Sequence, residues 1–538
     1  MIAKEELINE LSLFWLYKKK EISLYYKQGL VKGAIVLSIA GGISKVLGGI
    51  YRIPLARLIG DEGMALYQMA YPIYTSILAL TTAGIPVAIS ILIARKETQG
   101  YTGDSQRIFQ VSLIMLIVFG SILTLLVFET APIIAKNILN DPRACYPIMA
   151  VAPAIFISSL MAVFRGYFQG YRSMTPTAVS QVVEQIFRVT SILILAFLFF
   201  PKGLQFAVAG ATFGAVIGGI IGLVILIYYY ATFKIRDEED KYALIYSESS
   251  IVVHAKEVVQ LAIPVSLGAC ILPVVQILDA IIVRQRLETI HYSKIQATVL
   301  FGQLSGKAAV LIGLPSIFII AISTSLVPAI SEAIAQKDHN LLNKRINYGF
   351  RAGAIISFPC AAGLYALAFP ICNLLYATAE AGIPLEVLAF SCIVIAAFQL
   401  SSADLQGIGH PEIAMFSLVI IGLLKVLLNY TLTSIPVLNI RGAALATVIS
   451  FFIGSLLNIV LLKKKTGVVY EGIRLFRIAL ATIIMAIAVR LFYQILLGLD
   501  FHSYLATAIV IIVGVGIYGI ELLILREIDW EMFKFTNK

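Results

Sequence analysis

The segment from Leu204 to Tyr230 reads LQFAVAGATFGAVIGGIIGLVILIYYY and contains no charged residue. An α-helix needs about 20 predominantly apolar residues to cross the roughly 30 Å of hydrocarbon in a bilayer, and this segment is long enough. The strands of an outer-membrane barrel would instead alternate apolar and polar positions over about ten residues. The segment therefore predicts a transmembrane helix.

Similar apolar runs recur along all 538 residues, of which 59% are hydrophobic and only 13% charged, with a mean hydropathy of +0.91. Soluble domains carry about 25% charged residues, so a soluble fold is excluded. We expect an all-α, polytopic integral membrane protein with about fourteen transmembrane helices. Their approximate limits are 32–52, 66–93, 108–128, 146–169, 177–200, 204–230, 257–283, 305–333, 346–370, 384–406, 412–434, 437–462, 473–498 and 502–525.

The distribution of basic residues predicts the orientation of the chain. Residues 1–31 place lysines around a short apolar stretch with no cleavage site of small residues, which indicates a cytoplasmic interfacial segment rather than a signal peptide. With this end inside, most of the 41 Lys and Arg residues fall on the cytoplasmic side, and so does the C-terminus. Topology then explains the formal charge of +10, and no nucleic-acid partner is expected.

Short motifs recur in the same order in two halves of the chain. The members of each pair are separated by about six helices, an even number, so we expect a parallel repeat about an axis along the membrane normal. Chance similarity between apolar helices is the alternative. The matched motifs are Ala88-Ile89-Ser90 with Ala329-Ile330-Ser331, Phe168-Gln169-Gly170 with Leu405-Gln406-Gly407, and Gly210-Ala211 with Gly442-Ala443.

The repeat predicts two six-helix lobes with a cleft between them, followed by two further helices. The predicted parts are the interfacial segment 1–31, an N-lobe at 32–233, a cytoplasmic linker at 234–256, a C-lobe at 257–465, and residues 466–538 with the last two helices and a cytoplasmic tail.

Ionisable side chains inside the apolar runs are candidate site residues, because each costs about 2.5 to 3.5 kcal/mol at the bilayer centre unless it meets a partner or water. In the first helix, Lys45 and Arg52 share one face with Gly41 and Gly48. We expect both cations to line a central cavity. The alternative is that Lys45 snorkels and Arg52 lies among the outer headgroups.

The other helices show similar polar faces. Glu184 and Arg188 are four residues apart in the fifth helix, so they could line the cavity or form a structural ion pair. The remaining pairs are Gln276 with Asp279, Gln303 with Lys307, and Lys425 with Asn429. We expect Lys307 to project into the cavity as well. The residues expected to bind the substrate are Lys45, Arg52, Arg188, Gln276, Gln303, Lys307 and Lys425, and Glu184 and Asp279 are expected to be gate or ion-pair residues. Cations outnumber acids in these deep stretches, which predicts an anionic substrate, since Lys and Arg bind phosphate oxygens well.

No catalytic, cofactor or metal motif is found. Gly302, Gly306 and Lys307 resemble a phosphate-binding loop, but the spacing is one residue short and Ala308 replaces the required Ser or Thr. The five cysteines lack CxxC spacing, and we expect neither disulfides nor a metal site. Transport would then depend on an ion gradient, the membrane potential or the gradient of the substrate.

Several ordered motifs resemble one known family. The chain is similar to the MurJ-like lipid II flippase family of the multidrug/oligosaccharidyl-lipid/polysaccharide exporter superfamily, in particular to its stage V sporulation protein B and YtgP branch. The residues that carry the resemblance are Ser44-Lys45-Val46-Leu47-Gly48, Ala56-Arg57, Gly60, Gly63, Tyr67-Gln68, Tyr71-Pro72, Gly84-Ile85-Pro86, Leu314-Pro315 and Ser325-Leu326-Val327-Pro328-Ala329-Ile330-Ser331-Glu332.

The resemblance implies fourteen helices in two lobes of a bacterial cytoplasmic membrane protein. It also implies a cationic cavity and alternating access that exports an undecaprenyl-pyrophosphate-linked saccharide. Basic positions of the family correspond to Lys45 and Arg57 and roughly to Lys307. The sequence differs where lipid II flippases carry an adjacent Arg-Asp pair, because it has Tyr51-Arg52, and its second helix lacks their basic residues. We expect Arg57 and Glu332 to be gate or ion-pair contacts.

Several functions remain open at this stage. The leading hypothesis is export of a peptidoglycan precursor, general or sporulation-specific, with membrane lipids and other cell-wall synthesis proteins as partners. Alternatives are a flippase for another lipid-linked polysaccharide unit, a drug/cation antiporter, which would require an acidic cavity, and a membrane-embedded glycosyltransferase. Such an enzyme should carry paired outer acids, but Asp61, Glu62, Asp141 and Glu380 form no obvious pair in the sequence.

Overall fold

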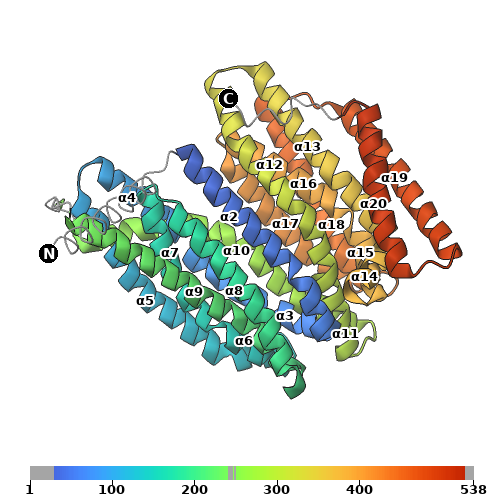
Figure 1. Cartoon of the computed structure of the whole chain (residues 1–538), viewed down its shortest axis with the longest axis horizontal. Helices are drawn as coiled ribbons and strands as arrows, with labels where there is room; N and C mark the ends of the chain where they lie inside the picture. The colour runs from blue at the N-terminus through green and yellow to red at the C-terminus, as the bar shows by residue number, and fades with distance from the viewer. Residues whose placement is uncertain (1–29, 240–245, 248–249, 528–538) are drawn as a thin grey trace, which may run out of the picture.

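The computed structural model describes residues 30–239, 246–247 and 250–527, so the predicted interfacial segment and the end of the tail lie outside the described residues. Every regular element in this part of the chain is a helix, which confirms the all-α fold (Figure 1). The first elements are α2 (Leu30–Ile50), α3 (Arg52–Thr82), α4 (Ile85–Thr98), α5 (Thr102–Ile133), the π-helix η1 (Ile134–Ile138), η2 (Pro142–Ala144), α6 (Cys145–Val151), α7 (Pro153–Gly170), α8 (Thr175–Phe199), η3 (Phe200–Lys202) and α9 (Leu204–Glu239).

The later elements follow a connection between Glu239 and Ile251 that is shorter than the predicted linker 234–256. They are α10 (Ile251–Thr289), α11 (Lys294–Phe301), the π-helix η4 (Gly302–Ala308), α12 (Ala309–Ala335), α13 (His339–Ala366), α14 (Ala368–Tyr376), η5 (Ala379–Ala381), α15 (Gly382–Leu388), α16 (Ser391–Gly407), α17 (Pro411–Leu432), α18 (Ile440–Thr466), α19 (Gly472–Gly498) and α20 (Ser503–Ile524).

The helices are long and apolar enough for a multi-pass membrane protein. By length and composition, 11 helical segments of the described part of the chain could cross a bilayer, or up to 13 if each of two bent pairs is one span. One of the 11 is the 64-residue segment Ile35–Thr98. A straight helix of that length would extend about 96 Å, three times the hydrocarbon thickness. The helix breaks at Gly60, whose φ of 67° is left-handed. If the segments before and after Gly60 are counted as two spans instead of one, the upper count of 13 spans becomes the predicted fourteen.

The glycines of α9 bring it into close contact with α8. Gly210, Gly214 and Gly218 recur every four residues, and a Cβ atom on any of them would lie within 2.8 Å of α8. Such small-residue stripes allow the backbones of membrane helices to approach closely. This packing holds α8 in place, and α8 carries Glu184 and Arg188.

The helices form two groups with α10 between them. Helices α3–α9 pack on one another, as do α12, α13 and α16–α18, whereas α10 contacts both α3–α5 and α17 (Figure 1). Helices α19 and α20 pack together at the far edge of the second group, against α13. The pseudo-symmetric relation between the two halves stays a prediction.

The bundle has two ends, which we name by their residues. The Gly60 end contains Gly60, where α3 changes direction, and the loops before α6 and α11. The linker end contains the connections from α4 to α5 and from α9 to α10.

Candidate functional site

A cavity of about 330 Å³ lies between the last two turns of α2 and the middle of α8. Gly48 of α2 would place a Cβ atom 3.2 Å from the Gln185 side chain, and Ser44 donates a hydrogen bond to the Gln181 carbonyl at 3.4 Å. The two polar faces predicted on the first and fifth helices therefore face each other across this space. The lining residues are Ser44, Lys45, Gly48, Tyr51, Tyr71, Gln185 and Arg188.

The cavity wall carries a net positive charge. Within the described part of the chain, no acidic side chain lies within ion-pair distance of Lys45, which is exposed to the open space. Arg188 binds the Glu184 carboxylate at 2.5 Å, so the pair that the sequence allows is present. Glu184 also binds Arg165 of α7 at 2.7 Å, so one carboxylate serves two guanidinium groups. Arg165 is not recognisable as a site residue from the sequence, because Arg165 lies near the end of an apolar run.

Arg52 lies beside the cavity rather than in its wall. Its guanidinium carbon is 5.8 Å from the centre of the Tyr71 ring, which does line the cavity. Its Nε atom is buried and has no hydrogen-bond partner within the described part of the chain. Tyr71 stacks on Tyr67 at 5.3 Å, and the Tyr67 and Tyr51 hydroxyls are 2.8 Å apart. Arg52 therefore adds positive charge behind an aromatic wall.

Lys307 is not in the cavity, which corrects the expectation that it projects into water. Its side chain is fully buried, forms an ion pair with Asp61, and donates to the Thr378 hydroxyl at 2.9 Å. Gln303, another predicted binding residue, donates to the other Asp61 oxygen at 2.9 Å. Both side chains are thus bound to a carboxylate of the first helix group.

Further contacts join the two groups at the Gly60 end. Arg57 donates to the carbonyl of Leu375 at 2.7 Å and to that of Leu374, where α14 ends. This position suits a cation because carbonyl groups at a helix C-terminus are unpaired and carry partial negative charge. Gln68 donates to the Ser305 carbonyl at 2.8 Å. Arg57 therefore binds backbone carbonyls rather than an acid, and its role at a gate stays a prediction. We call Arg57, Asp61, Gln68, Gln303 and Lys307 the closure.

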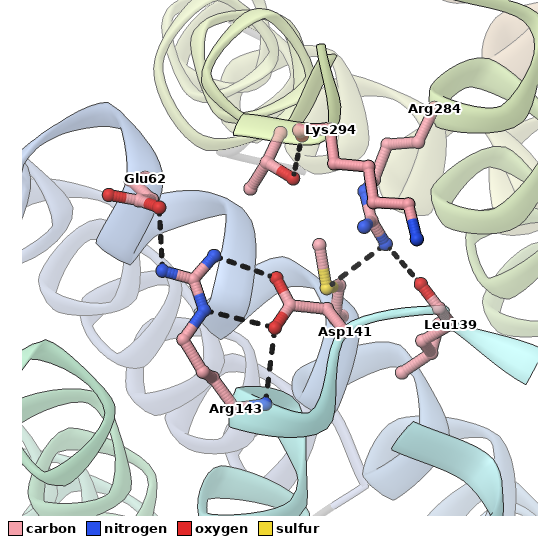
Figure 2. A network of polar contacts seen from close by, with 8 residues as sticks. Glu62, Leu139, Asp141, Arg143, Arg284 and Lys294 are labelled. Atoms are coloured by element: carbon pink, nitrogen blue, oxygen red, sulfur yellow. Dashed lines mark hydrogen bonds and ion pairs between the residues drawn. The ribbon is translucent and has the colours of Figure 1, made fainter. Parts of the chain in front are cut away.

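A second polar network lies next to the closure (Figure 2). Arg143 binds Glu62 at 2.6 Å and Asp141 at 2.9 Å, and the buried Arg284 of α10 donates to the Leu139 carbonyl at 2.5 Å. Burial opposes ionisation of Asp141, but the hydrogen bonds and charge of Arg143 outweigh it and hold the pKa of Asp141 below its ordinary value. These acids are therefore bound by arginines rather than paired for catalysis.

The glycines that resemble a phosphate loop have a packing role. A Cβ atom on Gly302 would lie 1.9 Å from the Asp61 carbonyl oxygen, and one on Gly306 would lie 2.6 Å from the Met64 side chain. Only glycine allows η4 to approach α3 this closely, and that approach brings Lys307 to Asp61.

The remaining predicted residues lie apart from the cavity. Lys425 of α17 binds Asp279 of α10 at 2.5 Å, and Asn429 donates to the same carboxylate at 2.6 Å, so Lys425 is neutralised. Gln276 is exposed on α10. Glu332 forms an ion pair at 2.9 Å with Arg345 of the neighbouring α13, within the second helix group. Across the described residues, no cluster of His, Cys, Asp and Glu could hold a metal ion.

The fold is shared with solved membrane transporters. The lipid II flippase MurJ in an inward closed conformation superposes with a TM-score of 0.71 at 17% identity, covering 92% of this chain and 99% of that one. A multidrug resistance MATE family transporter in an inward-facing conformation superposes with a TM-score of 0.66 at 16% identity, covering 79% and 94%.

The chain belongs to the Polysacc_synt family, described as polysaccharide biosynthesis protein, whose model matches residues 30–334. The MatE family model matches residues 305–431. Stage V sporulation protein B of Bacillus subtilis (strain 168) is 32% identical, covering 80% of this chain and 83% of that protein. Lipid II flippase MurJ of the same organism is 29% identical, covering 91% and 93%. The resemblance found in the sequence is confirmed, and the chain is a transporter rather than an enzyme.

Proposed function

We propose that this transporter carries an undecaprenyl-pyrophosphate-linked peptidoglycan precursor, similar to lipid II, outward across the bacterial cytoplasmic membrane by alternating access. The observation that carries the proposal is the cationic cavity, in which Lys45 has no acidic partner among the described residues and Arg188 shares Glu184 with Arg165. A membrane protein maintains an unpaired cation at this depth only where water or an anion reaches it.

The chemistry of the wall suits a pyrophosphate group. Lys45 offers three N–H donors and Arg188 a planar guanidinium, and both bind phosphate oxygens strongly. Gln185 and Ser44 can donate further hydrogen bonds from the same wall. A cationic drug would meet positive charge here, which disfavours an antiporter function despite the MatE match.

The proposed cycle follows from the closure. With both termini in the cytoplasm, as the basic residues predict, the Gly60 end faces outward, and the Asp61–Lys307 pair closes the outer side of the cavity. The substrate then enters from the cytoplasmic side. Outward release requires the closure to break, and because opening separates a buried ion pair, it must be driven by substrate binding or by an ion gradient.

A second candidate is flipping of another lipid-linked polysaccharide unit, which the description of the matching family favours. A role in sporulation is a narrower form of the first proposal, suggested by the 32% identical relative.

Reconstituted flipping separates these candidates. The purified chain in liposomes is offered lipid II or an undecaprenyl-pyrophosphate-linked polysaccharide unit, each placed in one leaflet, and the appearance of the headgroup in the other leaflet is measured. The proposal predicts faster appearance of lipid II than of the polysaccharide unit. Preference for the polysaccharide unit would establish the second candidate, and transport of neither would refute both.

A further inference from the structure

A buried histidine lies at the linker end, opposite the closure. His254 is in the first turn of α10, and its side chain is fully buried. Its Nε2 atom lies 3.8 Å from an oxygen of Asp104 in α5, and its Nδ1 atom lies 3.5 Å from an oxygen of Glu257 in α10. Neither ring nitrogen has a hydrogen-bond partner among the residues that the structure describes.

This geometry suits a protonated imidazole. Ionised carboxylates only accept hydrogen bonds, and a neutral imidazole has one donor nitrogen and one acceptor nitrogen. With a carboxylate near each nitrogen, the neutral ring would direct a lone pair at one of the two acids. The imidazolium ion has two donors and a positive charge, so it satisfies both acids.

Asp104 also connects several segments of the chain. Its carboxylate is fully buried and accepts a hydrogen bond from Lys96 of α4 at 2.9 Å. It also accepts from the backbone N–H of Ser247 at 3.2 Å and from the hydroxyl group of Ser247. Arg107 lies 3.9 Å away. One carboxylate thus joins α4, α5, the linker and α10. Among the described residues, the charged groups within ion-pair distance of His254 are Asp104 and Glu257, and Lys96 of α4 and Arg107 of α5 lie within that distance of Asp104.

We propose that His254, Asp104 and Glu257 form a binding site for one proton that fastens the start of α10 to the first helix group. Binding of the proton creates one ion pair between α10 and Asp104 of α5 and a second one, with Glu257, within α10. Loss of the proton leaves a neutral ring facing two acids. Because α10 contacts both groups, as α2 also does, this fastening affects their relative movement. The site is separate from the cavity and depends on no particular substrate.

The direction of the pH effect follows from the charges. The fastened state is favoured when His254 is protonated, so acidification strengthens it. Histidine is the side chain whose charge most readily changes at physiological pH. Raising the pH should therefore release the start of α10.

Hydrogen exchange of the full chain in lipid nanodiscs tests the proposal. Protection of amides in 250–260, corrected for the intrinsic pH dependence of exchange, is measured from pH 5.5 to 8.0. We expect protection to fall by about tenfold with rising pH, the factor for one charge-assisted hydrogen bond of about 1.5 kcal/mol. His254→Gln should abolish this dependence. The matched control is His410→Gln at the same end, because His410 forms an exposed pair with Glu412 at 2.8 Å, and it should behave as the native chain.

A second variant keeps the proposal testable if His254→Gln does not fold. Glu257→Gln removes one of the two acids, whose side chain is 36% exposed, and should shift the midpoint of the protection change to lower pH. Protection that does not change with pH in the native chain, or a pH dependence that persists in His254→Gln, would overturn the proposal. An unchanged midpoint in Glu257→Gln would also overturn it.

Discussion

The Lys307 side chain is fully buried and forms an ion pair with Asp61, which belongs to the other helix group and is 12% exposed. Thr378 and Gln303 complete the hydrogen bonds around the pair. An ion pair between two groups of helices has two arrangements, joined and separated. It is therefore suited to hold one state of a transporter rather than to bind substrate.

Lys307→Ala should weaken the closure. Breaking a buried ion pair by removing one partner costs about 3 to 5 kcal/mol, because the other charge remains buried without compensation. We expect faster labelling of a cysteine placed at Ser305, in a background without the native cysteines, by a maleimide that does not cross membranes. The double variant Asp61→Leu with Lys307→Leu should label more slowly than Lys307→Ala. Equal labelling of Lys307→Ala and the unsubstituted background would show that the pair does not hold the closure.

Gly302→Ala should disturb the same region through its shape. The added methyl group would lie 1.9 Å from the Asp61 carbonyl oxygen, so η4 must move away from α3. Overpacking of this kind costs about 1 to 3 kcal/mol, and we expect a lower midpoint of thermal unfolding. Gly313→Ala is the control, since a Cβ atom there meets nothing within 4 Å. A similar midpoint for both variants would contradict the close-packing interpretation.

The features that the sequence predicted well are those set by one helix at a time. The length of apolar runs predicts the spans, and spacings of three and four residues place Lys45 with Gly48, and Glu184 with Arg188, on single faces. The cavity forms where these two faces meet. Gln185, which follows Glu184 in the fifth helix, also lines the cavity.

Pairings between helices could not be predicted, because one sequence does not say which helices are neighbours. Asp61 was interpreted as an outer-loop acid and Lys307 as a cavity cation, yet they bind each other. The available signal was energetic. A lysine within an apolar run needs a partner or water, and the acids nearest to the same end of the bundle were candidates for that partner.

Variants of Lys425 and Asp279 test whether Lys425, a predicted binding residue, has a structural role instead. Lys425→Met or Asp279→Leu alone should lower the unfolding midpoint, because each leaves a charge within the membrane unpaired. The double variant should recover stability, since it removes both charges. If Lys425 binds the substrate instead, the double variant will be stable but will flip substrate much more slowly than the native chain. Native flipping by the stable double variant assigns the pair a structural role.

Lys45 gives the sharpest test of the cationic cavity. It lines the cavity and, within the described residues, has no acidic partner, so Lys45→Ala leaves no unpaired carboxylate behind. The protein should therefore fold and accumulate normally. Loss of one charge-assisted hydrogen bond to a phosphate costs about 1.5 to 3 kcal/mol, which is roughly one to two decades of affinity. Flipping of lipid II in liposomes should accordingly require 10 to 100 times more substrate for half-maximal rate, by the same conversion.

Lys45→Arg should retain most of the activity because it keeps the charge. Lys463→Ala, which removes an exposed lysine at the end of α18, controls for the loss of a cation elsewhere. If Lys45→Ala flips substrate as the Lys463→Ala control does, the cavity does not bind the pyrophosphate.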